Sequence, residues 1–528
     1  MKNARLIWKP KAMNAAIAMA CANGFLVSPA LAVGYCGVNA GSLPVVDTSM
    51  TQQCQLPSDS SSIDATINTG VKIEVSTNTA AVYYSGNLGN SENSQGSLTN
   101  NGTISSTGNG SSAPSDVNVG VRISGNLIGT LTNNHLISGT STNNAGSAFA
   151  LGVGVGNIFT TRQMLGTMVN NGAISATATG SGSGYAIAYF VTDAVAPEAS
   201  ITNNVNGSIT ATMNASGGYA AGISANTFNG TLNNAGTISG TVLNGGVAYS
   251  LLLSSGSDGL VNNLATGVLS GSLMTGSGIT VNNAGTLDLP LTLNAGPATG
   301  FIGGNYDQTE TGVLKIAALS ADPAGYSQLT VGGNATIAGK AFVDVKTANT
   351  LAVGQTLQGV VTAGTLSGNF ASVADNSSLF NFISVVNGSH IDFQIIKGMT
   401  VTEAITSQSN NPAAGAAGVL DSLIAAGSTG NAGMDAIVTT LGQLTTQQQV
   451  SNAVSQTLPL LPGGQAVAVS GSLHSVNRIV QARQEGQHGR SSGDEFLGNK
   501  QAWVKPFGSA ADQDDKSGVS GYKARTSG

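Results

Sequence analysis

Residues 230–240 read Gly-Thr-Leu-Asn-Asn-Ala-Gly-Thr-Ile-Ser-Gly, and this unit recurs along the chain. An Asn-Asn pair is followed within a few residues by Gly, a small residue and Ile or Leu. The pairs are Asn100-Asn101, Asn133-Asn134, Asn170-Asn171, Asn203-Asn204, Asn233-Asn234, Asn262-Asn263 and Asn282-Asn283, and His135 replaces the Gly after the second pair. Counted on the second Asn, they are spaced by 33, 37, 33, 30, 29 and 20 residues. A period of this size indicates a solenoid, propeller or array.

The residues around each pair predict short strands joined by a tight corner. Thr, Ile, Val and Leu flank the pairs in runs too short for a helix, while Asn and Gly suit a corner. A third apolar run follows in most units: Asn118 to Ile123, Ala148 to Val155, Tyr185 to Val191, Tyr219 to Ser224 and Val247 to Leu253. Three strands per coil predict an all-β fold, a parallel β-helix.

Stacked coils of a β-helix place equivalent side chains about 4.8 Å apart, so equivalent asparagines can hydrogen-bond along the axis. We therefore expect one structural ladder in one corner, which sets the register of the coils. Its members are Asn101, Asn134, Asn171, Asn204, Asn234, Asn263 and Asn283.

Composition supports an ordered β-stack. Charged residues make up 8% of the 528 positions, against the usual quarter, and hydrophobic residues make up 41%, too many for a disordered chain. Between Val33 and Gly300 the basic residues are Lys72, Arg122 and Arg162, against ten acidic ones. This region therefore lacks the basic surface that nucleic-acid binding requires.

Residues 1–32 have the pattern of a secretory signal peptide. Lys2, Arg5, Lys9 and Lys11 precede an apolar segment, Ala12 to Val27, and Ala30-Leu31-Ala32 forms an A-x-A cleavage site. Cys36 and Cys54 are the cysteines of the exported remainder. We expect them to form a disulfide that pins the first coil, because two cysteines without a nearby histidine give too few ligands for a metal site.

The residue composition and pattern change at residues 301–398, where the Asn pairs stop. Aromatic residues become about twice as dense, which suits an atypical coil that closes the apolar end of a solenoid. Alternating strand patterns occur at Tyr306-Asp307-Gln308, Gly312 to Ile316, Tyr326 to Val331 and Ala341 to Val345. Together with Asp375 to Phe380 and Asp392-Phe393, this segment resembles the C-terminal part of a pertactin-like autotransporter passenger. The resemblance implies a cap that nucleates folding of a β-helix at residues 33–300.

Residues 399–499 show helical spacing, at Val419, Leu420, Leu423 and Ile424 and again at Ile437, Leu441 and Leu444. A third helix is expected at Gln465 to Gln484, with a small-residue face of Ala468, Gly471, Ser472 and Ser475. In autotransporters a helix at this place threads the barrel lumen. An ordinary packed helix is the alternative.

Residues 500–528 resemble the opening of an autotransporter translocator barrel. Gln501 to Asp515 and Gly518 to Ala524 match a first strand, an acidic turn and the start of a second strand, with departures at Ala510, Arg525 and Ser527. A barrel start of this length cannot close, because spanning strands need about 9 to 11 residues each and every edge must be paired. If the chain is truncated at Gly528, we expect a periplasmic product.

Patterns that could carry catalysis are weak. Gly489 to Gly493 fits G-x-S-x-G but lies in a linker, and Asp421-Ser422-Leu423 lacks the Gly of the autotransporter esterase motif. The closest carboxylate pair of the middle coils is Asp193 with Glu198, and Asn477 is a weak candidate for self-cleavage. The histidines, His135, His390, His474 and His488, are far apart. We expect no catalytic, cofactor-binding or metal-binding residues, hence no cofactor.

The resemblance implies an exported, right-handed β-helical passenger of the type V secretion class, structural or adhesive, at the outer membrane or cell surface. Its expected partners are a host-cell or matrix ligand and the export machinery of both membranes, with neither nucleic acid nor a small-molecule substrate. A truncated, secretion-incompetent remnant is the alternative. A β-helical carbohydrate-active enzyme is less favoured, because charged groups are scarce.

Overall fold

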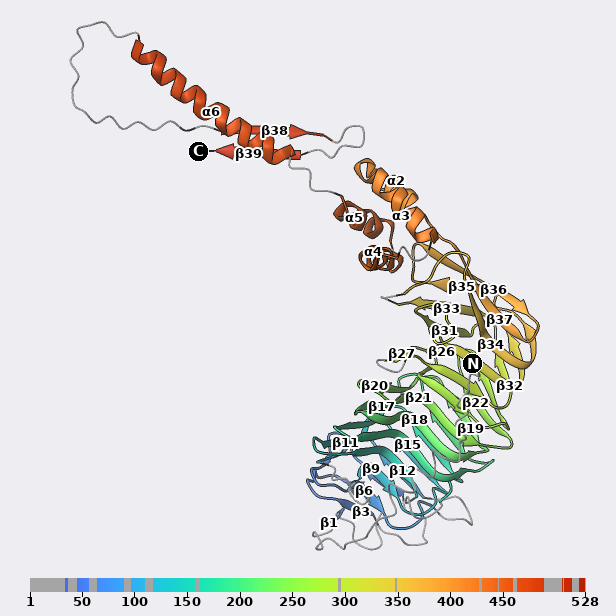
Figure 1. The fold of residues 1–528 in the computed structure, drawn as a ribbon. Coiled ribbons are helices and arrows are strands. Elements are labelled where there is room, and N and C mark those ends of the chain that lie inside the picture. The colour runs from blue at the N-terminus through green and yellow to red at the C-terminus, as the bar shows by residue number, and fades with distance from the viewer. Residues whose placement is uncertain are drawn as a thin grey trace, which may run out of the picture. The chain divides into compact units, whose positions relative to one another are not determined.

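The computed structural model is a parallel β-solenoid of about nine turns, followed by helices and a β-hairpin (Figure 1). It describes residues 34–36, 45–56, 64–89, 96–109, 117–156, 162–292, 296–346, 349–426, 430–444, 446–458, 463–488, 506, 508–514 and 522–527. The chain divides into two compact units, Met1–Asn376 with Asn381–Ile396, and Ser377–Phe380 with Lys397–Gly528. The predicted signal peptide and residues 501–505 lie outside the described residues.

Each coil contributes three strands, and strands of successive coils pair in parallel. The first ladder ends at the Asn corner and contains β2 (Val45–Val46), β4 (Asp64–Ile67), β7 (Ser97–Asn100), β10 (Thr130–Asn133), β13 (Thr167–Asn170), β16 (Ser200–Asn203), β19 (Thr231–Asn234), β22 (Gly259–Asn263), β25 (Ile279–Asn283) and β30 (Tyr306–Gln308). The second ladder, an 11-stranded sheet, contains β5 (Lys72–Val75), β8 (Thr103–Gly108), β11 (Leu136–Asn143), β14 (Ala173–Gly180), β17 (Ser208–Asn214), β20 (Thr237–Val242), β23 (Val268–Ser270), β26 (Thr286–Leu289), β31 (Val313–Ala318), β33 (Lys340–Val345) and β35 (Ser372–Asp375).

The third ladder contains β1 (Gly34–Tyr35), β3 (Cys54–Leu56), β6 (Ala80–Tyr84), β9 (Asn118–Ile123), β12 (Ala148–Val155), β15 (Ser183–Val195), β18 (Gly217–Phe228), β21 (Val247–Ser255), β24 (Ser272–Thr275), β29 (Thr299–Ile302) and β32 (Gln328–Ile337). Strand β32 pairs with β29 in its first half and with β30 in its second. This strand therefore joins the first and third ladders into one 24-stranded sheet.

The core forms because side chains alternate between the interior and solvent along every short strand. In the second ladder the parallel register stacks five fully buried residues: Ile104, Ile137, Ile174, Ile209 and Ile238. Burying each of these isoleucines contributes about 1.5 to 3 kcal/mol. The repeat of Ile in the sequence is thus a column of the core.

The third strand approaches the second strand so closely that one position must be small. A Cβ at Gly152 would lie 2.8 Å from Ile174 Cγ2 and 2.5 Å from the Ala188 carbonyl oxygen, and a Cβ at Gly222 would lie 2.6 Å from Ile238 Cγ2. Each strand can cross here only without a larger side chain.

The end of the solenoid is rich in antiparallel pairing. Strand β34 (Thr356–Gly368) pairs in parallel with β32 and antiparallel with β37 (His390–Lys397), which follows β36 (Phe380–Asn387). Within this unit Phe370 and Phe393 pack edge to face at 5.7 Å. A small antiparallel pair, β27 (Leu291–Thr292) and β28 (Gly296–Pro297), lies earlier in the chain, between β26 and β29.

The second unit contains α2 (Val401–Ser407), the 3-10 turn η1 (Asn411–Ala413), α3 (Ala414–Ala426), α4 (Ala432–Gly442), α5 (Gln447–Gln456), α6 (Gly463–His488), β38 (Gly508–Gln513) and β39 (Tyr522–Ser527). Both α2 and α5 begin with capping boxes, at Thr400 with Glu403 and at Thr446 with Gln449. Among the described residues, no helix combines the length and apolar character needed to cross a membrane.

Candidate functional site

The corner after each first-ladder strand holds a ladder of buried asparagines. Each Nδ2 donates to the Oδ1 of the equivalent Asn in the next coil, at 2.8 Å in every step. The members of this inner ladder are Asn100, Asn133, Asn170, Asn203, Asn234, Asn263 and Asn283. All are at most 1% exposed. The ladder therefore runs through the core from β7 to β25.

The seven asparagines predicted from the sequence divide between two ladders. Asn234, Asn263 and Asn283 belong to the inner ladder. The others, Asn101, Asn134, Asn171 and Asn204, hydrogen-bond to one another outside the core, where Asn101 is half-buried and the rest are exposed. This is the outer ladder.

The prediction of a single ladder was therefore wrong by one residue in four coils. The cause is a one-residue shift of the Asn pair relative to the corner. Up to Asn203 the first Asn of each pair enters the core, and from Asn234 the second one does, because Asn203 pairs with Asn234, 31 residues later. Beyond that point the first members, Asn233, Asn262 and Asn282, bond to one another on the outward-facing side of the strands.

The inner ladder also satisfies the corner backbone. Asn170 Nδ2 donates to the Gly172 carbonyl of its own corner at 3.0 Å and to the Ser208 carbonyl of the next coil at 3.2 Å. Because carbonyls can only accept, these bonds fix which end of the carboxamide is Nδ2. At the last coil Asn283 Nδ2 donates to the Tyr306 hydroxyl at 3.2 Å, and Tyr306 donates to Gln308 Oε1 at 2.8 Å.

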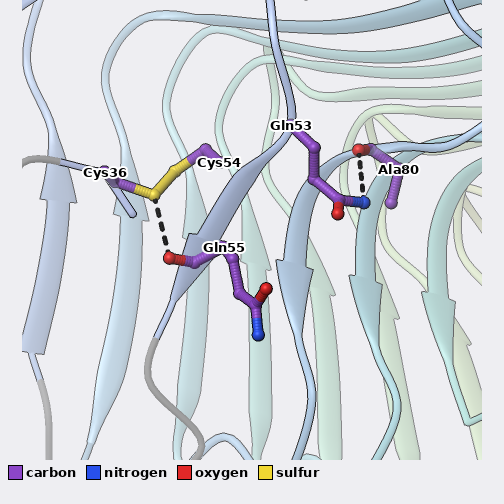
Figure 2. The surroundings of a disulfide bond; sticks show 5 residues. All are labelled: Cys36, Gln53, Cys54, Gln55 and Ala80. Carbon is purple, nitrogen blue, oxygen red and sulfur yellow. Dashed lines mark hydrogen bonds between the residues drawn. A yellow bond between two sulfur atoms is a disulfide. The ribbon is translucent and has the colours of Figure 1, made fainter. Parts of the chain in front are cut away.

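A disulfide joins Cys36 to Cys54 beside β3 (Figure 2). Both cysteines are at most 1% exposed, and their Cα atoms lie 5.1 Å apart. Next to it, Gln53 Nε2 donates to the Ala80 carbonyl of the next coil at 3.1 Å. The bridge thus ties the segment before β2 to the stacked coils.

Aromatic side chains line the side of the third ladder that faces away from the core. Phe149, Tyr185 and Tyr219 are direct register partners on β12, β15 and β18. Tyr249 on β21 pairs with Ala221, two positions further along, and its ring meets that of Tyr219 diagonally. We call these four residues the aromatic strip. Their ring centroids are 5.8, 5.2 and 6.2 Å apart in sequence order. Three of the four keep intermediate exposure, so their edges face solvent.

A narrow pocket lies beside Phe149, lined by Val117, Arg122, Leu151, Phe190 and Thr192 among others. Burial lowers the pKa of the Arg122 guanidinium, because removing a cation from water disfavours its charged form. Burial likewise raises the pKa of Tyr249. The strip and this pocket thus form an apolar surface beside one embedded cation.

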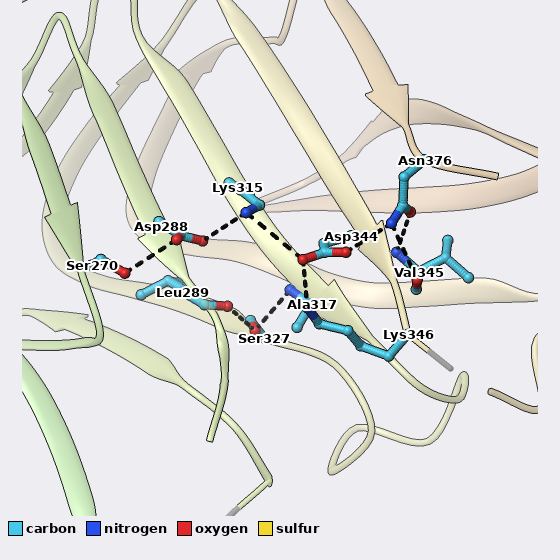
Figure 3. A network of polar contacts seen from close by, with 10 residues as sticks. All are labelled: Ser270, Asp288, Leu289, Lys315, Ala317, Ser327, Asp344, Val345, Lys346 and Asn376. Atoms are coloured by element: carbon cyan, nitrogen blue, oxygen red, sulfur yellow. Dashed lines mark hydrogen bonds and ion pairs between the residues drawn. The ribbon is translucent and has the colours of Figure 1, made fainter. Parts of the chain in front are cut away.

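A chain of charges crosses the second ladder near its end (Figure 3). Lys315 Nζ on β31 lies 3.7 Å from Asp288 Oδ1 on β26 and 3.7 Å from Asp344 Oδ2 on β33. Lys346 Nζ also contacts Asp344 Oδ2, at 2.5 Å. Alternating charges on three neighbouring strands hold their register. Upstream, the same outward position carries Ser105, Ser138, Ser175, Thr210, Ser239 and Ser270.

The side chains considered as catalytic candidates make hydrogen bonds that support the fold. Asp421 on α3 accepts hydrogen bonds from the Val401 and Thr402 backbone nitrogens at 2.7 and 3.1 Å, so it caps α2. His135 lies in the Asn corner near Thr103, and His390 lies on β37 near Thr362. In the described part of the chain, no three His, Cys, Asp or Glu residues are grouped closely enough to hold a metal ion. The Gly489 to Gly493 motif falls outside that part.

Neither a known family profile nor a curated protein matches this chain.

The aromatic strip was missed by the sequence interpretation. Its signal was present, because a Phe or Tyr begins or interrupts the third apolar run at Phe149, Tyr185, Tyr219 and Tyr249. Sequence alone does not show that these rings share one outer surface.

Proposed function

We propose that this chain is an exported, non-catalytic passenger of the autotransporter class, a right-handed β-helical rod that acts as a structural or adhesive protein at the cell surface. In this proposal residues 399–499 link the rod to a translocator barrel that begins near residue 500. The host-cell or matrix ligand contacts the side of the rod. The observation that carries the adhesive part is the aromatic strip on an uninterrupted stack.

The aromatic strip is suited to adhesion because aromatic rings supply large contact area with few rotatable bonds. It extends over four successive coils, and the surrounding residues Leu151, Ile187 and Leu252 give it a packed apolar base. A rigid base keeps the rings in place before contact, which lowers the entropic penalty of binding. The strip itself carries no charge, so we expect adhesion that depends little on salt.

The linker and barrel part is supported by the second unit. In α6 the small-residue side packs on the hairpin, since a Cβ at Gly471 would lie 3.2 Å from Ser509 Oγ on β38. Strands β38 and β39 pair antiparallel from Gly508 with Ser527 to Gln513 with Tyr522. A helix with a small-residue side against a β-hairpin fits a helix held inside a barrel wall.

Adhesion and export are tested separately. We expect cells that display the passenger to bind matrix-coated or cell-coated surfaces, and Tyr185→Ser with Tyr249→Ser to reduce retention several-fold. Leu264→Ser is the matched control, because Leu264 is an exposed apolar residue that follows β22 at the Asn corner, off the third ladder. Equal retention of all variants would overturn the adhesive role. Protease treatment of intact and permeabilised cells tests export, and cleavage of the passenger only after permeabilisation would overturn its place at the cell surface.

A further inference from the structure

The asparagine ladders have a chemical consequence for the chain's Asn-Gly sequences. An Asn followed by Gly is prone to spontaneous deamidation, because glycine has no side chain to hinder attack by its own backbone nitrogen. The structure describes six such pairs: Asn101-Gly102, Asn171-Gly172, Asn206-Gly207, Asn229-Gly230, Asn244-Gly245 and Asn387-Gly388. Whether each one reacts depends on whether the Gly nitrogen and the Asn carboxamide can meet.

Two of the six pairs have side chains held in the outer ladder. Asn101 Oδ1 accepts from Asn134 Nδ2 at 2.7 Å, and the attacking Gly102 nitrogen donates to inner-ladder Asn100 Oδ1 at 3.1 Å. Asn171 is held at both ends of its carboxamide, by Asn134 and by Asn204. Ring closure at either pair requires the ladder to open first.

Two further pairs are held by corner hydrogen bonds. The Gly207 nitrogen donates to the Asn204 carbonyl at 2.7 Å. Asn229 Oδ1 accepts from the Ser257 backbone nitrogen at 2.8 Å, and Gly230 is buried. Hydrogen bonds within the corners and between stacked coils thus restrain four Asn-Gly pairs of the repeats.

The remaining two pairs lie in exposed turns without such restraints. Asn244 is exposed between β20 and β21, and Gly245 has φ +82°. Asn387 and Gly388 are both exposed at the tip between β36 and β37, where Gly388 has φ +62°. Over the described residues, neither Gly nitrogen has a hydrogen-bond acceptor. The Asn387 carboxamide has one long contact, from Nδ2 to Asp392 Oδ2 at 3.4 Å.

We infer that, of the six described Asn-Gly pairs, Asn387-Gly388 and Asn244-Gly245 are the ones that undergo spontaneous deamidation in the folded protein, whereas the four restrained pairs stay intact. The Gly nitrogen loses its proton to hydroxide or a buffer base and bonds to the Asn Cγ. The bond from Cγ to the amide nitrogen breaks, and ammonia leaves with a proton from water. Water then opens the cyclic imide at either carbonyl, which gives aspartate or isoaspartate.

At Asn387 this change weakens the turn that it modifies. Asp392 Oδ1 accepts from the Gly359 nitrogen at 2.7 Å and so holds the bend of β34, where Gly359 has φ +63°. A carboxylate in place of the Asn387 amide replaces a donor to Asp392 with a like charge. Deamidation at Asn387 should loosen the pairing of β34, β36 and β37, whereas deamidation at Asn244 meets no such partner.

The test incubates the full chain at mildly alkaline pH and physiological temperature and follows each Asn-Gly peptide by mass spectrometry. We expect Asn387 and Asn244 to convert at least about tenfold faster than the four restrained pairs, because those must first open locally. The same chain in denaturant is the control, where all six should react at similar rates. Comparable rates at all six pairs in the folded protein would overturn the inference, as would intact Asn387 and Asn244.

A second measurement tests the consequence at the turn. Asn387→Asp should lower the thermal midpoint more than Asn244→Asp, and the difference should shrink at acidic pH, where carboxylates are protonated. Equal midpoints for the two variants at neutral pH would refute the role of Asp392.

Discussion

Replacing Asn203 by Leu interrupts the inner ladder at a fully buried step. Asn203 Nδ2 donates to Gly207 at 3.2 Å, Asn234 at 2.8 Å and Thr237 at 3.3 Å, and its Oδ1 accepts from Asn170. In the variant, Asn234 Oδ1 loses its donor, while Asn170 Nδ2 keeps its two backbone acceptors. We therefore expect one group to be orphaned and a second to be weakened.

A buried polar group left without a partner costs about 1 to 3 kcal/mol, and one group is orphaned here, so the expected loss for Asn203→Leu is about 1 to 3 kcal/mol. Asn204→Leu is the matched control one residue away. Asn204 is exposed and bonds to Asn171 in the outer ladder, where water can replace the lost bond. Its expected change is within about 0.5 kcal/mol, as for ordinary surface substitutions.

Urea denaturation followed by circular dichroism measures both variants. We expect the Asn203→Leu midpoint to fall clearly below that of the parent and the Asn204→Leu midpoint to stay close to it. Equal losses would mean that both asparagines have the same environment and would refute the assignment of inner and outer ladders. No loss in either variant would refute the energetic role of the ladders.

Three further predictions concern the core, a helix and alkaline pH. Gly152→Val should abolish soluble folded protein, because its Cβ would lie 2.5 Å from the Ala188 carbonyl oxygen, and a parental thermal midpoint would contradict that close approach. A Cβ at Gly415 in α3 would meet no atom within 4 Å, so Gly415→Ala should stabilise α3 by about 0.5 to 1 kcal/mol. A lower unfolding free energy by calorimetry would contradict this. Burial raises the pKa of the Tyr189 hydroxyl above that in the unfolded chain. The stability gained by burying the neutral tyrosine is therefore complete below about pH 10 and is lost at higher pH, where the hydroxyl ionises more readily in the unfolded chain. Tyr189→Phe should therefore reduce the alkaline slope of the unfolding free energy by about 1.4 kcal/mol per pH unit, and an unchanged slope would contradict that burial.

The solenoid could be predicted because its cause is local and repeated. Short β-branched runs, corner residues and a period near 30 residues all favour stacked coils, and strand patterns such as Tyr306-Asp307-Gln308 recur as β30. The helices were harder to predict. Three were expected after residue 399, whereas the described residues of that region contain five α-helices, because α2 and α5 depend on capping boxes and not on a long apolar stripe.

The candidate site was predictable only in part. Both members of an Asn-Asn pair are polar, so composition cannot tell which one enters the core. That choice depends on where the corner begins, and the corner shifts by one residue between Asn203 and Asn234. The aromatic strip depends on parallel register over three coils and a diagonal contact to a fourth, which is a relation between residues about 30 positions apart. Local patterns do not contain such a relation.

The inner ladder gives the solenoid a growth polarity. Every Nδ2 points toward the following coil, so a stack interrupted after Asn203 exposes a donor, whereas one interrupted before Asn234 exposes an acceptor. Unpaired buried donors are rarer than under-satisfied acceptors, so the two broken ends are not equivalent. A coil that joins from the N-terminal side brings a donor to an acceptor already in place. We therefore expect coils to add from the end at Tyr306 and Gln308 toward the N-terminus, as in templated polymerisation with one active end.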